Sequence, residues 1–197
     1  MKNIAIALKA EFLKLKHSTI LFFIVCFYIF IPIMMGLLMI LSQHPEIIAK
    51  MGLVGTKATL FATNNWHGYF DIINQMVAII GLNGFGFVIS WLFGREYMEH
   101  TITDILALPI PRSNLVIAKY IWALMLCTCL TFIMLLASFA VGKLIHIPEW
   151  SNEITVTFLK KFLITAGMTI LVSMPVGFIA SWSKGIIAPI GFVIVTL

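Results

Sequence analysis

The sequence predicts an all-α, polytopic membrane protein. Of its 197 residues, 61% are hydrophobic and only 11% are charged, and the mean hydropathy is +1.05. A soluble fold could not cover so much apolar surface with so few charges. The apolar residues form long, uniform runs, which favour helices over the alternating strands of a transmembrane barrel. The length alone would fit one globular domain, so the composition decides the class.

Residues 1–17 are predicted to form an amphipathic helix that lies in the cytoplasmic headgroup layer, where its lysines would pair with anionic membrane lipid. The alternative is the basic start of a signal peptide. That alternative is disfavoured because the next apolar run spans about 24 residues and has no A-x-A-like cleavage site. One apolar and one basic stripe recur along this helix: Ile4, Leu8, Phe12 and Leu15, and Lys2, Lys9 and Lys16.

Five apolar runs follow, and the long ones can cross a hydrocarbon core of about 30 Å. We predict a transmembrane domain over 18–197. Pro32 and Pro175 predict kinks in the first and fourth spans. The last run is incomplete, so we expect the sequence to be cut short there, with a re-entrant end as the alternative. The predicted spans are 18–42, 75–93, 115–141, 158–182 and the incomplete 186–197.

Polar and aromatic residues near the spans favour structural interpretations. Asn83 lies mid-span beside small residues, which favours a hydrogen bond across a helix interface over substrate contact. The 43–74 segment is interpreted as an outer loop. Its aromatic cluster at 66–70 is typical of an interfacial anchor, with a short helix lining a substrate exit as the alternative.

The sequence predicts neither a metal site nor a disulfide. His146, Glu149 and Glu153 share a loop but do not form a convincing ligand set. The cysteines lie within apolar runs, and two of them are two positions apart, which points them away from each other on a helix.

The distribution of basic residues predicts a cytoplasmic N-terminus. With that orientation, eight Lys and Arg residues lie inside and five lie outside, which is the sign that the positive-inside rule requires. The net charge of +5 is therefore interpreted through membrane orientation, and no nucleic-acid partner is expected. The segment 94–114 then faces the cytoplasm.

The segment 94–114 is a charged, patterned island between two spans. As a helix, 95–108 would present an acidic face with Glu96 and Glu99 opposite an apolar face. Pro109 would end that helix, and Ser113 is a candidate N-cap for the next span. An acidic helix held between spans is suited to docking a soluble protein. An ordinary charged loop fits the pattern equally well.

The residues of this island resemble the hallmark of ABC-2-type exporter permeases, roughly F-x-x-E, G-T, L-x-x-P-x-x-R and K. The N-terminal helix and the spacing of the spans are similar to that family as well. His100 stands where the family has Gly, and the family typically has six spans. The small size is similar to permeases for peptide antibiotics such as bacitracin and lantibiotics. The matching residues are Phe93, Glu96, Thr101, Leu106, Pro109, Arg112 and Lys119.

The resemblance implies a permease subunit, not an enzyme, in the membrane of the cell. The chain has no G-x-x-x-x-G-K-[ST] phosphate loop, so ATP and Mg would bind to a separate ABC ATPase subunit, with no cofactor on this chain. Two permeases, as a homodimer or heterodimer, would sit over two ATPases. Coupling to the ATPase is assigned to Glu96, Glu99, Thr101, Leu106, Pro109 and Arg112, and packing or gating to Asn83, Pro32 and Pro175.

Two other classes of function are weighed against export. A membrane-embedded enzyme is disfavoured because the chain lacks H-E-x-x-H and G-x-S-x-G motifs. A non-transporting membrane anchor of a soluble complex would share the docking segment, and only a transport assay separates it from a permease. The almost wholly apolar span centres favour an amphiphilic or lipid-like cargo that enters laterally from the membrane.

Overall fold

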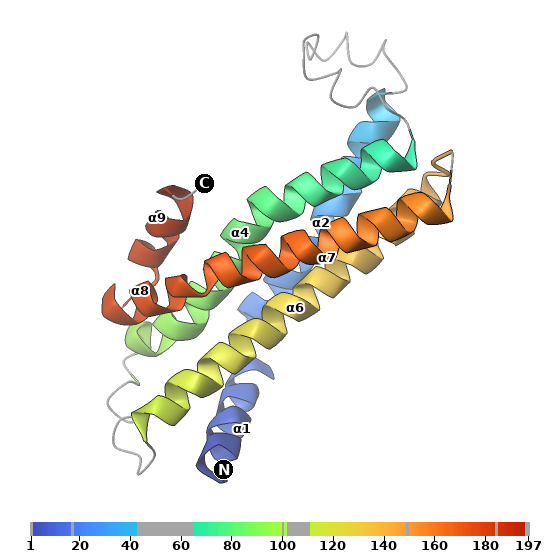
Figure 1. Ribbon diagram of the computed structural model, residues 1–197. Coiled ribbons are helices and arrows are strands. Elements are labelled where there is room, and N and C mark those ends of the chain that lie inside the picture. The colour runs from blue at the N-terminus through green and yellow to red at the C-terminus, as the bar shows by residue number, and fades with distance from the viewer. Residues whose placement is uncertain are drawn as a thin grey trace.

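The computed structural model of the protein describes residues 2–16, 18–42, 65–99, 101, 111–148, 150–183 and 185–195. All regular secondary structure in these ranges is α-helical, which confirms the predicted all-α class. Figure 1 shows the helices in chain order. They are α1 (Lys2–Lys16), α2 (Thr19–Ser42), α4 (Trp66–Met98), α6 (Arg112–Leu144), α7 (Asn152–Ser173), α8 (Pro175–Ser183) and α9 (Ile187–Val195).

Within the described residues, four helical stretches are long and apolar enough to cross a membrane: α2, α4, α6, and α7 continued by α8. They run up and down side by side (Figure 1). One end of the bundle, here called the α1 end, holds α1, the end of α4 and the start of α6. The opposite end, here called the far end, holds the start of α4, the end of α6 and the start of α7.

Two of the spans are longer than a bilayer requires. Helices α4 and α6 each have 33 residues, which corresponds to about 50 Å of helix, against a hydrocarbon core of about 30 Å. The predicted spans 75–93 and 115–141 therefore described only the apolar centres of these helices. Packing against neighbouring helices continues the helical structure into the polar layers, where hydropathy no longer marks it.

The start of α4 corrects the interpretation of 43–74 as a loop throughout. Asn65 caps the helix, and its side-chain oxygen accepts a hydrogen bond from the backbone N–H of Gly68 at 3.0 Å. The aromatic residues that follow are not lipid-facing anchors. Trp66, Tyr69 and Phe70 are all at most 3% exposed, so the protein interior holds them.

These aromatic side chains join α4 to α6 and α7 at the far end. The Phe70 ring stacks on Phe158 with a centroid distance of 3.9 Å. The Trp66 indole N–H donates to the Ile147 carbonyl at 2.9 Å, and the Tyr69 hydroxyl lies 3.3 Å from the Ser138 carbonyl. Because the rings stack and the Trp and Tyr polar groups have hydrogen-bond partners, this aromatic cluster, here called the aromatic joint, holds the three helices together rigidly.

The two prolines expected to kink their spans have different outcomes. Helix α2 is helical on both sides of Pro32. In the fourth span the helix is interrupted at Met174, and Pro175 begins α8. A proline at the first helical position loses nothing, because its missing N–H would be unpaired there in any case.

Helices α8 and α9 form a corner that packs against the later half of α4 (Figure 1). Gly94 of α4 makes this approach possible. A Cβ at Gly94 would meet the Ile186 side chain at 2.6 Å and the Gly185 carbonyl oxygen at 3.1 Å. The corner between α8 and α9 therefore touches α4 next to Arg95.

Two glycines provide a test of the far-end packing. A Cβ at Gly142 would lie 2.5 Å from the buried Trp66 ring, whereas a Cβ at Gly167 has no neighbour within 4 Å. We predict that Gly142→Ala lowers the melting temperature of the detergent-solubilised protein. The matched Gly167→Ala should raise it, because alanine favours helix over glycine by up to about 1 kcal/mol. Equal shifts for both variants would contradict the packing described here.

Candidate functional site

Five charged side chains from three helices meet at the α1 end of the bundle. We call this group the ion cluster: Glu11 and Lys14 of α1, Arg95 and Glu96 of α4, and Lys119 of α6. Four of them are buried, with Glu11 at 2% and Lys119 at 6% exposure marking the extremes. The Lys14 side chain is 38% exposed. Buried charges in a membrane protein are rare and mark functional sites by default.

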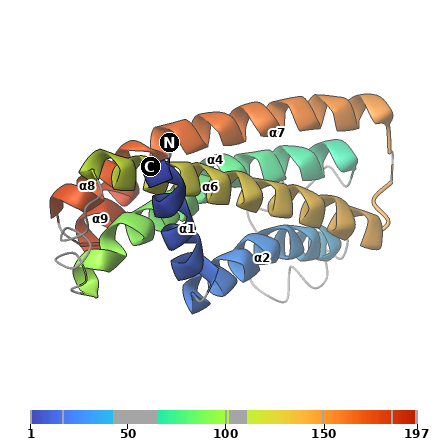
Figure 2. The same cartoon turned by 90° about the horizontal axis from the view of Figure 1, so that it is seen from below.

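Helix α1 delivers its acid to the cluster because one narrow face of the helix is buried. Ala7, Glu11 and Leu15 recur every four residues and are all at most 4% exposed. Helix α1 packs against α6, as the view from below shows (Figure 2). The Trp122 indole N–H of α6 donates to the Leu8 carbonyl at 3.0 Å, and its ring stacks on Phe12 at 5.4 Å.

The apolar stripe predicted for residues 1–17 and the face of α1 that packs against the bundle do not coincide. Phe12 of the stripe is 47% exposed, whereas the buried face is centred on Glu11. Ion pairs to α4 and α6, together with Lys14 of α1 itself, compensate the Glu11 carboxylate when this face of α1 lies against the bundle.

Glu11 is the first of two acids that join all three helices. Its Oε2 accepts a hydrogen bond from Arg95 Nη2 at 2.7 Å. Its Oε1 lies 3.8 Å from Lys119 Nζ and 3.4 Å from Lys14 Nζ. The Arg95 guanidinium also lies over the Trp91 ring, 5.2 Å from the ring centroid, a distance typical of a cation–π contact.

Glu96 is the second acid, and two lysines hold it. Its Oε1 lies 2.8 Å from Lys14 Nζ and 3.1 Å from Lys119 Nζ. Lys119 Nζ also donates to the Leu92 carbonyl at 2.9 Å and lies 5.8 Å from the centroid of the Phe93 ring. Three residues from the two ends of the quoted motif, Phe93, Glu96 and Lys119, therefore meet in one place.

The expectation that Glu96 faces a soluble partner is not met in this structure. Glu96 is 4% exposed and its carboxylate is paired within the chain. Helix α4 continues through Met98, which turns Glu96 toward α1 and α6 while Glu99 remains exposed at the helix end. The acidic face predicted for 95–108 is thereby divided between an interior acid and a surface acid.

The other residues predicted for coupling have mixed outcomes. The Thr101 backbone N–H donates to the Glu96 carbonyl at 3.1 Å, which closes the turn after α4. Arg112 is the first residue of α6. Pro111, not Ser113, stands at the N-cap, and no side-chain cap bond is present there. Leu106 and Pro109 lie outside the described residues.

Asn83 does not bond across a helix interface within the described chain. Its Nδ2 donates to the Ile79 carbonyl of its own helix at 3.1 Å. It lines a cavity between α2 and α4 instead, as does the neighbouring Gly84. The small residues beside it make room for Tyr28, because a Cβ at Gly84 would collide with the Tyr28 ring and hydroxyl.

Sequence reasoning missed Glu11, although a signal was present. It is the one acid in a helix whose other charged residues are Lys2, Lys9, Lys14 and Lys16, and it lies four residues from both Ala7 and Leu15. An acid on the side of small and apolar residues indicates a buried partner.

Two lysines and an arginine pair with both acids of the ion cluster. No set of three or more His, Cys, Asp or Glu side chains suited to a metal is found in the part of the chain that the structure describes. What the cluster can do is mechanical, because it ties the end of α4 to α1 and α6.

The four helical stretches that are long and apolar enough to cross a membrane identify the chain as a multi-pass membrane protein. The model of the ABC-2 family of transporter proteins matches residues 7–197, and the chain belongs to that family. This confirms the resemblance to the ABC-2 family that was seen in the motif.

The chain is also similar to the bacitracin transport permease protein BCRB of Bacillus licheniformis. The two are 27% identical over 127 residues, which cover 64% of this chain and 61% of that protein. The match thus spans about three-fifths of the length of the relative. No solved structure matches the chain significantly.

Removal of the Glu11 carboxylate tests the cluster. We predict that Glu11→Leu destabilises the folded protein by about 3–5 kcal/mol, because Arg95 is left buried without its ion partner. A second change, Arg95→Met, should recover most of that loss, since an apolar pair can replace a buried ion pair. Thermal unfolding in detergent compares the stability of the unchanged protein, of Glu11→Leu and of the double variant Glu11→Leu with Arg95→Met.

The matched control for Glu11→Leu is Lys14→Ala, which removes the exposed member of the cluster. Its cost should stay below about 1 kcal/mol, as for a surface ion pair. If Lys14→Ala were as costly as Glu11→Leu, the buried pairs would not be the ones that hold α1.

Proposed function

We propose that this chain is the permease subunit of an ATP-driven exporter that moves an amphiphilic substrate across the cell membrane. The observation that carries the proposal is the family match over residues 7–197 together with the ion cluster at the α1 end. A separate ABC ATPase subunit would bind ATP and Mg, and two permeases would pair as a homodimer or heterodimer.

The proposed docking surface for the ATPase is the α1 end. Here the exposed Glu99 lies one turn from the buried Glu96, beside the start of the 100–110 segment. Glu99 would contact basic groups on the ATPase, and Leu106, Pro109 and Arg112 belong to the same proposed contact. Movement of the 94–114 segment would reach α1 and α6 through the ion pairs of Arg95 and Glu96, which makes Glu96 a positioning residue.

An amphiphilic cargo is supported by two features. The helix faces on the outside of the bundle carry many exposed apolar side chains, such as Phe22, Leu136 and Ile164 at 64%, 67% and 68% exposure, which is the surface expected of spans that contact lipid. The relative is named for bacitracin transport, and a peptide antibiotic or a lipid-like compound would satisfy the same requirement.

The proposed orientation puts the N-terminus and the 99–111 connection in the cytoplasm, since two crossings separate them. We predict that in a variant with its cysteines replaced by alanine, Trp150→Cys at the far end reacts with a membrane-impermeant maleimide on intact cells. Lys16→Cys should react only after the membrane is opened. The reverse pattern would contradict the orientation, and a cysteine-free chain controls for background labelling.

Charge reversal at Glu99 tests the proposed ATPase contact. Because like charges across an interface repel, we predict that Glu99→Lys weakens co-purification of its ABC ATPase subunit by at least about tenfold. Glu153→Lys, which reverses an exposed acid in the first turn of α7 at the far end, is the matched control and should leave binding unchanged.

Reconstitution in vesicles distinguishes export from the two alternatives. A permease with its ATPase should move an amphiphile such as bacitracin across the bilayer and hydrolyse ATP faster in its presence. Binding of the ATPase without transport or stimulation would favour a membrane anchor. Chemical conversion of the amphiphile without ATP would favour an enzyme.

A further inference from the structure

A small cavity of about 230 Å³ lies between α4 and α7 at the far end of the bundle. Acidic and basic side chains face it together, so it can select a ligand by charge. His67 and Asp71 reach it from the first two turns of α4, and Glu153, Thr157 and Lys161 from the first three turns of α7. The other lining residues are Phe70, Ile154 and Phe158.

The charges at this cavity are only partly paired within the described chain. The Asp71 carboxylate lies 3.0 Å from His67 Nδ1 and 3.7 Å from Lys161 Nζ. The second distance is too long for a hydrogen bond, so the Lys161 ammonium can still donate to another acceptor. Among the residues that the structure describes, Glu153 forms neither an ion pair nor a side-chain hydrogen bond. The cavity thus offers an acceptor to a cation and a donor to an anion.

The cavity lies at the depth of the lipid headgroups. The 33 residues of α4 extend beyond a hydrocarbon core of about 30 Å by about 10 Å at each end when the helix is centred, which is roughly its first six or seven residues. In α7 the uncharged run begins at Phe162, directly after Lys160 and Lys161. The stack of Phe70 on Phe158 holds these two helix ends side by side.

Apolar surface continues from the cavity toward the hydrocarbon core. Ile164 and Met168 follow Lys161 by three and seven positions, which places them on the same side of α7. Their side chains are 68% and 60% exposed. A lipid with its headgroup in the cavity can therefore lay its chains along α7.

The mixture of charges selects the class of headgroup. A purely anionic headgroup would meet the carboxylates of Asp71 and Glu153 against a single lysine. A quaternary ammonium has no N–H to donate to Glu153. A headgroup with both a primary ammonium and a phosphate can form charge-assisted hydrogen bonds with Glu153 and Lys161 at the same time.

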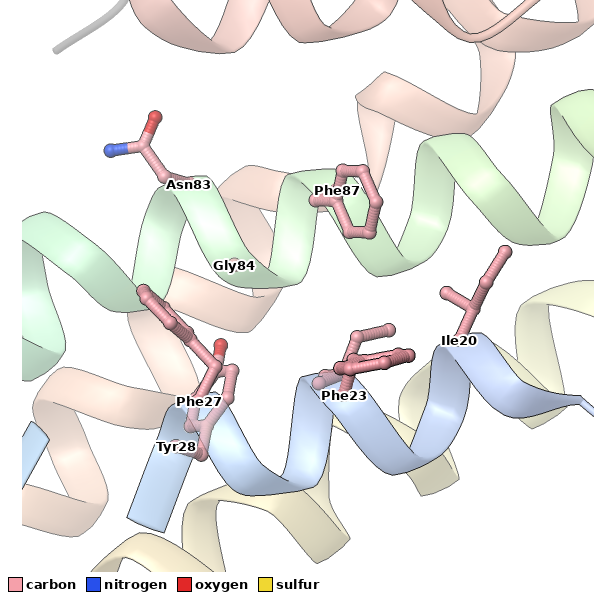
Figure 3. A pocket seen from close by; sticks show the side chains of 8 residues that line it. Ile20, Phe23, Phe27, Tyr28, Asn83, Gly84 and Phe87 are labelled. Carbon is pink, nitrogen blue, oxygen red and sulfur yellow. The ribbon is translucent and has the colours of Figure 1, made fainter. Parts of the chain in front are cut away.

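The larger cavity between α2 and α4, of about 540 Å³, offers no such selection (Figure 3). No charged side chain is among its described lining residues. The Tyr28 hydroxyl is buried against Gly84, out of reach of a ligand. Discrimination between headgroups by charge is therefore a property of the far-end cavity.

We propose that the far-end cavity binds a phospholipid whose headgroup carries a primary ammonium, as in phosphatidylethanolamine. The lipid ammonium donates to the Glu153 carboxylate, and the Lys161 ammonium donates to the lipid phosphate. A lipid held in this way bridges α4 and α7 beside the aromatic joint. The site goes beyond the proposed transport function, because its binding requires neither the ATPase nor a transported substrate.

Binding of short-chain lipids to the detergent-purified protein tests this site, with native mass spectrometry to measure the bound lipid. Dioctanoyl phosphatidylethanolamine is compared with phosphatidylcholine and phosphatidylglycerol of the same chains. We expect phosphatidylethanolamine to bind at least about tenfold more tightly than either, as one charge-assisted hydrogen bond would give. Glycerophosphoethanolamine, which has the same headgroup without acyl chains, should bind at least about tenfold more weakly than the lipid, because no apolar chain is buried.

Charge variants separate the two ends of the headgroup. Glu153→Gln should lower the affinity for phosphatidylethanolamine to that for phosphatidylcholine. Lys161→Gln should weaken all three lipids alike, because each carries a phosphate. The matched control is Lys160→Gln, since Lys160 is the neighbouring exposed lysine but does not line the cavity, and its lipid affinities should equal those of the unchanged protein.

A second pair of variants tests the cavity itself. Thr157 is an exposed lining residue, so Thr157→Trp fills the cavity without disturbing the core and should abolish the preference for phosphatidylethanolamine. Val156→Trp is the matched control, because Val156 is 52% exposed on the same turn but lies outside the lining. This control should keep the preference.

Equal binding of phosphatidylethanolamine and phosphatidylcholine to the unchanged protein would overturn the proposal. Persistence of the preference in Glu153→Gln or in Thr157→Trp would overturn it as well, since the lipid would then be selected elsewhere. If glycerophosphoethanolamine bound as tightly as the lipid, the ligand would be a soluble compound, and the assignment to a lipid would be refuted. None of these outcomes depends on transport, so they leave the proposed function to its own test.

Discussion

The bundle depends at its α1 end on one buried carboxylate. Glu11 receives Arg95 at 2.7 Å on one oxygen and faces Lys119 and Lys14 on the other. Without it, Arg95 would be an uncompensated charge in an apolar setting, and α1 would be held to α4 and α6 by the Lys14–Glu96 pair and the contacts of Trp122 alone among the contacts described above. The amphipathic helix that a lipid surface could bind on its own is thereby tied to the spans.

The ion cluster and the aromatic joint restrain the same helices in different ways. At the far end, stacked rings such as Phe70 on Phe158 hold α4 by shape and tolerate little displacement. At the α1 end, long basic side chains hold α4 by charge.

Much of the fold could be predicted because hydrocarbon thickness and helix rise fix the length of a span. The helix ends could not, because Asn65 and the packing around Trp66 extend α4 beyond any apolar run. The motif identified Glu96 and Lys119 but not their contact, and it said nothing of Glu11. Which face of α1 is buried depends on residues distant in sequence, so helical periodicity alone did not identify it. Asn83 was misjudged for the same reason, since its surroundings depend on where α2 packs.

The lack of a side chain at Gly94 brings α1 and the corner before α9 to the same turn of α4. The residue next to it, Arg95, is held by Glu11 of α1, while the Gly94 backbone is in contact with Gly185 and Ile186 at the corner before α9. One helical turn of α4 therefore contacts both α1 and the corner before α9. A side chain at position 94 would push the corner before α9 away from the turn of α4 that carries Arg95, so the packing of α9 and the pairing of α1 depend on the same turn of α4.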